Sequence, residues 1–351
     1  MPLASVLMPT YNGEKYITDA INSIIQQSFQ DFELIIVDDG SDDGTPAIIN
    51  QFLKKNGDKI RLAVHSRNQG ISSATNTALA NARGKYIFPM DHDDVALPKR
   101  LEASIRFLES SPHLSGCGAL HVKMSKYDFI NRLKIKQAEL SARLVRPETV
   151  AASSLFGGKL FNPTVCFKKD ALNLVSEYFK PDLLVGADNE FYARLQRAGA
   201  RFSIIPLVLT LYRRHGENTS LLHPEGATEM RKNISKQAVL RLVPGANEKE
   251  IELHTKLAIR DKSIGPKVLP LLDAWFAKLL STTTCEAEKQ GLLEVLSENW
   301  VQACALAACT NFSAGWKSYY KQDELKQTLP SRLSFLYSYQ KRKIRHILRN
   351  K

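Results

Sequence analysis

Residues 32–46 read FELIIVDDGSDDGTP, and this stretch decides the fold class. The run from Phe32 to Val37 is nearly all apolar and rich in β-branched side chains, as in a strand that is covered on both faces. Acidic residues and glycines follow it, and Thr45-Pro46 then offers a helix start with proline at the first helical position. The stretch therefore predicts a strand, a polar loop and a helix in succession.

The same succession recurs along the first hundred residues. Strand-like segments at residues 5–8, 60–65 and 86–90 alternate with helical patterns at 14–27, at 72–82 and from Pro98 onward. Such alternation predicts an α/β fold, with a mostly parallel sheet between layers of helices. Sheets of this kind bind ligands at the carboxyl ends of their strands, so the segments after the strands are the candidate site.

Composition places the chain among globular proteins. It has 351 residues, a 44% hydrophobic fraction and a net charge of +12, which argues against a disordered or fibrous protein and favours acidic partners. The first ten residues resemble a buried strand rather than a signal peptide, and no apolar stretch is long enough to span a bilayer. The five cysteines show no metal-binding spacing, which is typical of reduced thiols in a cytosolic protein.

The second part of the chain has a different character. From about residue 226, apolar residues such as Ile251, Leu257 and Trp300 recur at helical spacing. We therefore expect residues 226–351 to form a helical region appended to an α/β domain of residues 1–225.

Four polar segments follow the predicted strands: PTYNG (9–13), DDGSDDG (38–44), RNQG (67–70) and DHDD (91–94). Together they bring an aromatic ring, carboxylates and an arginine to one edge of the sheet, which suits a base, a ribose and a phosphate. Neither a GxxxxGK[ST] phosphate loop nor a GxGxxG turn is present. Asp91 and Asp93 instead offer oxygen ligands for Mn²⁺ or Mg²⁺, although a lone DxD is also typical of a solvated loop.

Taken together, the segments VLMPTYNGEKYI, FELIIVDDGSDDGT and NQGISSATNTALANARGKYIFPMDHDD resemble the family-2 glycosyltransferases with the GT-A fold. The resemblance continues through FNPTVCFKK (161–169), GADNEFYARLQRAG (186–199) and LYRRHGENTS (211–220). It implies a Rossmann-like domain with a donor half at about 1–100 and an acceptor half at about 101–225. It also implies an inverting, metal-dependent transfer of sugar from a nucleotide diphosphate, most simply uridine diphosphate, to a hydroxyl group.

The resemblance assigns roles to individual positions. The predicted nucleotide-sugar-binding residues are Pro9, Tyr11, Asn12, Asp39, Arg67, Asn68, Asp91, His92, Arg213 and His215. The predicted ligands of Mn²⁺ or Mg²⁺ are Asp93, Asp91 and His215, with Asp93 as the main one. Asp188 is the predicted catalytic base.

Two of these residues have simpler explanations. Asp188 is placed to open an amphipathic helix, where aspartate is also a common N-cap. His215 precedes Gly216, as many surface-loop histidines do, although Arg213 and Arg214 beside it favour a diphosphate clamp. Ala187 and Asn162 stand where many relatives have glutamate and histidine, which leaves the acceptor open.

Competing functions fit less well. A nucleotidyltransferase would open with a glycine-rich segment unlike PTYNGEKYI, and a non-catalytic scaffold would not need the full set of acids. A nucleic-acid partner is not expected, because no binding motif is present and the basic residues cluster in the tail.

That tail, residues 331–351, forms a basic amphipathic pattern when it is wound as a helix. It predicts docking to an anionic membrane, with a solvated terminal helix as the alternative. We therefore expect a cytoplasmic protein that docks to the inner face of the membrane, with a glycan or lipid-linked acceptor from surface polysaccharide or lipopolysaccharide synthesis. The sequence leaves the oligomeric state open.

Overall fold

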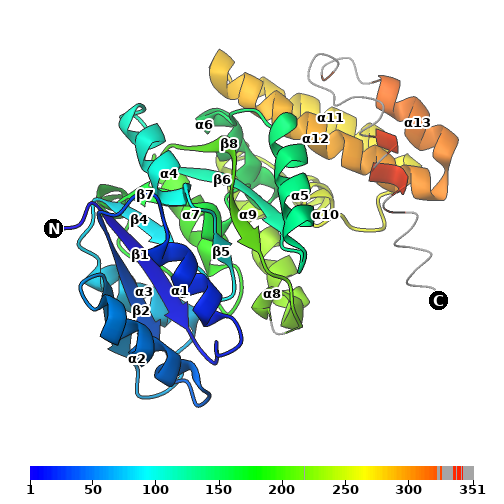
Figure 1. Cartoon of the computed structure of the whole chain (residues 1–351). Coiled ribbons are helices and arrows are strands. Elements are labelled where there is room, and N and C mark those ends of the chain that lie inside the picture. Colours follow the sequence, from blue (N-terminus) through cyan, green and yellow to red (C-terminus); the bar gives the residue numbers. More distant parts are fainter. Residues whose placement is uncertain (217, 322–324, 326–334, 337, 341, 343–351) are drawn as a thin grey trace. The chain divides into compact units, whose positions relative to one another are not determined.

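The computed structural model describes residues 1–216, 218–321, 325, 335–336, 338–340 and 342 (Figure 1). The chain divides into two compact units. The first contains residues 1–146 and 160–227, and the second contains residues 147–159 together with residues from 228 onward. The predicted boundary at 225/226 lies close to the second break, whereas the pattern of the sequence did not separate residues 147–159 from the first unit.

The first unit is built on one eight-stranded sheet in the order β3-β2-β1-β4-β7-β6-β8-β5. Its strands are β1 (Ala4–Thr10), β2 (Phe32–Asp38), β3 (Ile60–Val64), β4 (Tyr86–Pro89), β5 (Val95–Ala96), β6 (Gly116–Lys123), β7 (Cys166–Lys168) and β8 (Phe202–Tyr212). Strands β1 to β4 are mutually parallel, as are β6 and β8, while β7 and β5 pair antiparallel with their neighbours. The predicted mostly parallel sheet is therefore confirmed.

Helices cover both faces of the parallel strands. The first-unit helices in this part are α1 (Ile17–Ile25), α2 (Thr45–Asn56), α3 (Ile71–Asn81) and α4 (Arg100–Glu109). Val6 and Met8 of β1 pack in one cluster with the apolar faces of α1, α2 and α4. Helix α3 packs against β1 and β2 through the small residues Ala74 and Ala78, which lie outside that cluster. Every residue of β1 and β2 is buried, which explains their nearly continuous apolar pattern. The buried polar pair within them is satisfied internally, because the Ser5 hydroxyl donates to Glu33.

The remaining elements of the first unit were predicted less well. Pro98 does not start α4, which begins at Arg100, and the short strand β5 had no clear signal in the sequence. The other elements are α5 (Asp128–Leu140), η2 (Asn162–Thr164), η3 (Lys169–Leu174), α7 (Ala187–Arg197) and α8 (Thr219–Leu222).

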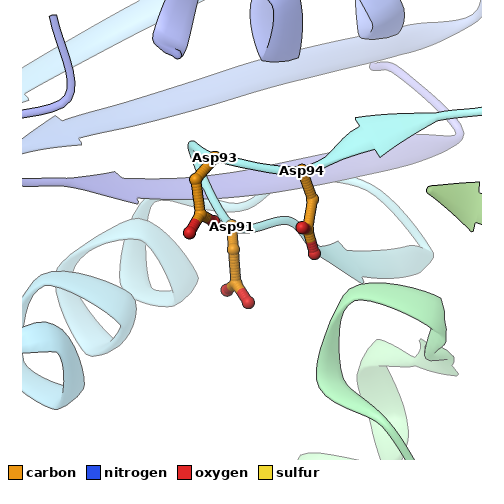
Figure 2. A group of neighbouring side chains, drawn as sticks. All are labelled: Asp91, Asp93 and Asp94. Atoms are coloured by element: carbon orange, nitrogen blue, oxygen red, sulfur yellow. The ribbon is translucent and has the colours of Figure 1, made fainter. Parts of the chain in front are cut away.

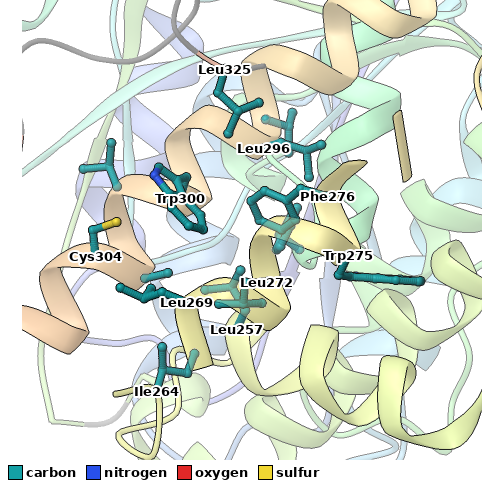
Figure 3. Packing of buried hydrophobic residues seen from close by; sticks show 14 of the residues in the cluster. Leu257, Ile264, Leu269, Leu272, Trp275, Phe276, Leu296, Trp300, Cys304 and Leu325 are labelled. Atoms are coloured by element: carbon teal, nitrogen blue, oxygen red, sulfur yellow. The ribbon is translucent and has the colours of Figure 1, made fainter. Parts of the chain in front are cut away.

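The second unit is helical, as the sequence predicts. It contains α6 (Pro147–Ala152), η1 (Ser153–Phe156), most of α9 (Pro224–Leu242), α10 (Glu248–Ala258), η4 (Pro266–Val268), α11 (Leu269–Ser281), α12 (Glu286–Thr310) and α13 (Phe312–Lys321). Figure 3 shows its core, in which Phe276 of α11 and Trp300 of α12 lie edge to face with their ring centroids 6.0 Å apart. None of the described helices has the length and apolar character that crossing a bilayer requires.

Part of the C-terminal tail belongs to this core. Phe335 is fully buried, and its ring lies 5.1 Å from that of Trp316 and 5.2 Å from that of Tyr319. Arg342 donates a hydrogen bond to the side chain of Gln302 in α12. Of the described tail residues, Phe335 and Arg342 thus contact the second unit. Residues 343–351 of the tail and several before them lie outside the described part, so the predicted membrane contact of that segment stays a prediction.

Candidate active site

The segments after β1 to β4 meet at one edge of the sheet, because these strands are parallel and in neighbouring positions. Thr10 at the end of β1 pairs with Asp38 at the end of β2, and Asp38 pairs with Val64 of β3. The four polar segments singled out in the sequence are thus brought together as predicted.

The loop after β1 is tied to the loop after β2. Asn12 adopts a left-handed backbone (φ 48°), and its side-chain amide donates to Asp42 Oδ1 at 2.8 Å while its Oδ1 accepts from the Asp42 N–H. The Gly13 N–H donates to Thr45 Oγ1. Asn12 therefore joins the two loops, and its predicted contact with the donor stays a prediction. Tyr11 beside it is 41% exposed.

Asp39 organises the turn after β3. Its Oδ1 lies 2.6 Å from His65 Nδ1 and accepts from the Gln69 N–H, and its Oδ2 accepts from the Gly70 N–H at 2.8 Å. The adjoining Gly40 has φ +73°, and a Cβ there would lie 2.7 Å from the carbonyl carbon of Arg67. The two loops are thus in close contact.

The predicted binding residues on this turn lie at the surface. Arg67 and Asn68 are both exposed, and the Asn68 side chain accepts from the Gly70 N–H. Pro9 is buried in β1, whose Thr10 carbonyl accepts from the Asp39 N–H. Of these residues, Arg67 therefore has the charge and the exposure to meet a ligand phosphate.

Three carboxylates gather on the loop between β4 and β5. One oxygen from each of Asp91, Asp93 and Asp94 lies within 4.8 Å of the others, and Figure 2 shows the three groups pointing to the same side of the loop. Burial, with the charges of Asp93 and Asp188, raises the pKa of Asp91 to about 7. Burial, with the charges of Asp91 and Asp93, raises the pKa of Asp94 to about 9. A cluster of this kind is stabilised by a cation.

The surroundings of the cluster fit such a cation. Asp94 Oδ1 accepts from the Arg213 N–H at 2.8 Å, but its Oδ2 is buried without a hydrogen-bond partner among the described residues. Arg100 lies fully buried nearby and donates to the Pro89 carbonyl, and its charge favours ionised Asp91 and Asp94. An unpaired carboxylate oxygen beside two further carboxylates is a donor set that Mn²⁺ and Mg²⁺ prefer.

His92 lies against the loop after β1. A Cβ at Gly13 would come within 2.7 Å of the His92 ring, so only glycine lets the two segments approach so closely. Burial lowers the pKa of His92, which keeps the imidazole neutral. His92 is half-buried against this loop, and its predicted contact with the donor stays a prediction.

His215 is brought to Asp93 by the loop after β8. Its Nε2 lies 2.8 Å from Asp93 Oδ2, and its ring lies tilted by 32° against that of Tyr16, with the centroids 4.5 Å apart. Asn218 holds this arrangement: its amide donates to Asp93 Oδ2 at 3.0 Å, and its Oδ1 accepts from the His215 N–H at 2.7 Å.

Arg213 has several partners inside the protein. Its Nε donates to the Asp93 carbonyl, its Nη2 pairs with Asp19, and its guanidinium lies 4.9 Å from the centre of the Tyr16 ring. The predicted contact of Arg213 with the donor stays a prediction, and in this structure the side chain ties β8 to α1.

Asp188 lies in the first turn of α7, after Gly186 in a left-handed conformation (φ 75°). Gly186, not Asp188, holds the N-cap position of this helix, although backbone N–H groups of Asp188 and Asn189 interact with the Asp188 carboxylate. Burial raises the pKa of Asp188, and its charge in turn raises that of Asp91. The helix is further linked to the cluster because Asn162 accepts from the Tyr192 hydroxyl and donates to Asp91 Oδ1 at 3.4 Å. The carboxylate of Asp188 therefore lies near Asp91 of the acid cluster.

This geometry coincides with a match to a known family. The model described as glycosyl transferase family 2 matches residues 5–166. This segment belongs to that family. It contains β1 to β4 and the acid cluster, whereas Asp188 and His215 follow it.

Relatives of known sequence support the family. An uncharacterized glycosyltransferase of Haemophilus influenzae is 28% identical over 68% of this chain and 73% of its own length. The putative glycosyltransferase EpsE of Bacillus subtilis is 38% identical, and the putative teichuronic acid biosynthesis glycosyltransferase TuaG of the same organism is 39% identical. The matches to EpsE and TuaG cover 33% and 30% of this chain and 42% of each relative.

Solved structures share the fold over most of the chain. Staphylococcus aureus TarS 1-349 in complex with UDP-GlcNAc has a TM-score of 0.58 and 19% identity, with 94% of this chain and 93% of that chain covered. The mannosyltransferase PcManGT from Pyrobaculum calidifontis, in complex with GDP-Man and Mn²⁺, has a TM-score of 0.53 and 20% identity, covering 96% and 87%. The GT-A fold of the family is thereby confirmed for this chain.

Several residues of the candidate site were not predicted to act there. Asp94 directly follows the DHD motif and completes the acid cluster, and its adjacency was the available signal. Tyr16 and Asn218 lie within segments that carry the family resemblance, but their contacts with His215 and Asp93 are formed only in the tertiary structure.

Proposed function

We propose that the protein is a metal-dependent inverting glycosyltransferase that moves a sugar from a nucleotide diphosphate to a hydroxyl group. One observation carries this proposal: Asp91, Asp93 and Asp94 cluster at the carboxyl edge of the sheet, with His215 on one of them and Asp188 close enough to raise the pKa of Asp91. The proposed site thus has two parts: a group of carboxylates that can bind a cation, and the separate carboxylate of Asp188, whose pKa is raised.

The two halves have different tasks in the proposed reaction. Asp91, Asp93 and Asp94 would hold Mn²⁺ or Mg²⁺, with His215 beside Asp93. A bound cation would offset the negative charge on the departing diphosphate. Tyr11 is exposed for stacking on the base, and the exposed Arg67 is available to a phosphate.

Asp188 supplies the proton acceptor. The acceptor hydroxyl oxygen forms a bond to the anomeric carbon as the bond from that carbon to the diphosphate breaks, and the hydroxyl proton passes to the Asp188 carboxylate. A single displacement of this kind inverts the anomeric configuration. Burial raises the pKa of Asp188, which makes its carboxylate a stronger base.

We also propose a specific donor and a class of acceptor. We propose a uridine-diphosphate sugar as donor, supported by the fold shared with TarS, whose structure holds UDP-GlcNAc. We propose a glycan or lipid-linked acceptor of surface polysaccharide or lipopolysaccharide synthesis, supported by the similarity to TuaG. The unpaired state of the five cysteines fits the reducing cytoplasm that we propose as the location.

A donor screen tests the proposal. The protein is incubated with Mn²⁺ or Mg²⁺ and a panel of nucleotide sugars, and binding and slow donor hydrolysis are recorded by calorimetry and chromatography. We expect one uridine-diphosphate sugar to bind and to release nucleotide only when the cation is present. A chain that binds no nucleotide sugar under either cation is not a glycosyltransferase of this kind.

A further inference from the structure

Helix α5 exposes an apolar stripe to solvent. Phe129, Leu133 and Leu140 are 64%, 59% and 79% exposed, and at ~100° per residue they fall within about 40° of one another around the helix. The opposite side of α5 is the one that packs, because Ile135 and Ala138 contact an apolar cluster of β6 and β8. The exposed stripe is therefore additional to the face that holds the helix in the first unit.

Basic side chains surround the stripe. Lys136 lies on the same side of α5 as the stripe. Lys126 precedes the helix, with its ammonium group over the Tyr127 ring, and Arg143 follows the helix. All three basic side chains are exposed. The acids of this segment are already engaged, since Asp128 pairs with Arg132 and Glu139 accepts from the Val208 N–H. The stripe thus combines large apolar tips with a net positive rim.

The start of α5 is fixed at the edge of the sheet that carries the candidate active site. The Met124 N–H donates to the Tyr212 carbonyl at 2.7 Å, and Lys123 pairs with Tyr212 in the sheet. Tyr212 directly precedes Arg213, whose N–H donates to Asp94. A surface that receives α5 would therefore lie close to the acid cluster.

We propose that α5 docks the first unit onto an anionic lipid surface, with Phe129, Leu133 and Leu140 inserted among the lipids and the basic rim on their headgroups. An amphipathic helix with large apolar tips and lysines beside them has the chemistry that binds such interfaces. A second copy of the chain is disfavoured, because a symmetric contact would place the two basic rims against each other.

Vesicle binding of the full chain tests this proposal without donor or transfer. The protein is sedimented with vesicles of phosphatidylcholine alone or with about one third phosphatidylglycerol, the latter also at raised salt. We expect binding to the anionic vesicles, weakened by salt because exposed charges are screened. Phe129→Ser with Leu133→Ser should weaken it roughly tenfold or more, and Lys126→Gln with Lys136→Gln roughly tenfold.

Matched variants separate this helix from general charge and from the C-terminal tail. Leu174→Ser changes an exposed leucine elsewhere in the first unit, and Lys54→Gln with Lys55→Gln removes the same charge from α2. Both controls should bind as the unchanged chain does, and melting temperatures should agree among all variants. The proposal is overturned if the α5 variants bind as tightly as the controls, or if the unchanged chain ignores anionic vesicles. It is equally overturned if the unchanged chain is a dimer in solution that the α5 variants dissociate.

Discussion

Nε2 of His215 lies 2.8 Å from Oδ2 of Asp93, although 122 positions separate the two residues along the chain. The contact joins the loop after β8 to the loop after β4, and Asn218 donates to the same carboxylate oxygen. An imidazole and an amide from one loop therefore contact Asp93, which belongs to the carboxylate cluster on the other.

Replacing Asp93 tests the cation-binding half. Asp93→Asn removes a charged oxygen ligand, so donor affinity in the presence of Mn²⁺ should fall roughly tenfold to a hundredfold. Titration calorimetry with and without the cation measures the change. If affinity with Mn²⁺ is unchanged, Asp93 is not a ligand of the cation.

Replacing Asp188 tests the other half. Asp188→Asn keeps the size of the side chain and removes the proton acceptor, so transfer should fall about 10² to 10⁴-fold while donor binding stays within a factor of about three. Product formation is followed by chromatography and binding by calorimetry. If Asp188→Asn and Asp93→Asn lose donor binding and transfer to the same extent, the two acids do not have the separate roles assigned to them.

Asn218 should act through its neighbours. Asn218→Ala removes the amide that holds Asp93 and the backbone of His215, and the loss of such hydrogen bonds should raise the donor KM roughly fivefold to tenfold. Steady-state kinetics measure the change. Asn299→Ala, which removes an amide from α12, is the control and should leave KM as it is. A fall in kcat with constant KM would contradict a positioning role.

His254 should make the second unit sensitive to acid. Burial lowers its pKa to about 4 from an ordinary 6.5, and its ring accepts from Trp275 while donating to the Leu155 carbonyl. Between pH 6.5 and 4 the unfolded chain binds a proton that the folded chain does not. Stability therefore falls as the pH drops through this window and levels off near pH 4, by at most about 3 kcal/mol.

Urea unfolding at several pH values measures this effect. The comparison is with His254→Gln, in which the pH dependence over the same window should be smaller even though its stability at pH 7 is lower. An identical pH dependence in both chains would show that His254 does not carry it.

Phe335 should stabilise the second unit. It is fully buried among the rings of Phe312, Trp316 and Tyr319, so Phe335→Ala should cost about 3 to 5 kcal/mol. Phe312→Ala is the control and should cost less, because Phe312 is 43% exposed. Equal and small losses in thermal unfolding would mean that the tail does not pack on this core.

Much of the fold could be read from local patterns. The apolar runs of β1, β2 and β4 and the helical spacing in α1 and α3 are properties of neighbouring residues. Burial on both faces of the sheet keeps the strand runs nearly continuous. Strand β5 and helix α5 were missed for the opposite reason. Two residues of β5 carry no periodicity, and α5 has apolar side chains on both its packed and its exposed side.

The sequence by itself determined the α/β alternation, the order of the strand-end segments and the acids that they carry, since each depends on residues a few positions apart. Only the tertiary structure decided that Asn12 joins the loop after β1 to the loop after β2, that Asp94 completes the acid cluster, and that Asn218 holds His215 on Asp93. It also decided that Phe335 is core rather than surface. The physical reason is that a hydrogen bond or a buried contact between distant segments depends on where the sheet and its loops place them, and no local pattern records that placement.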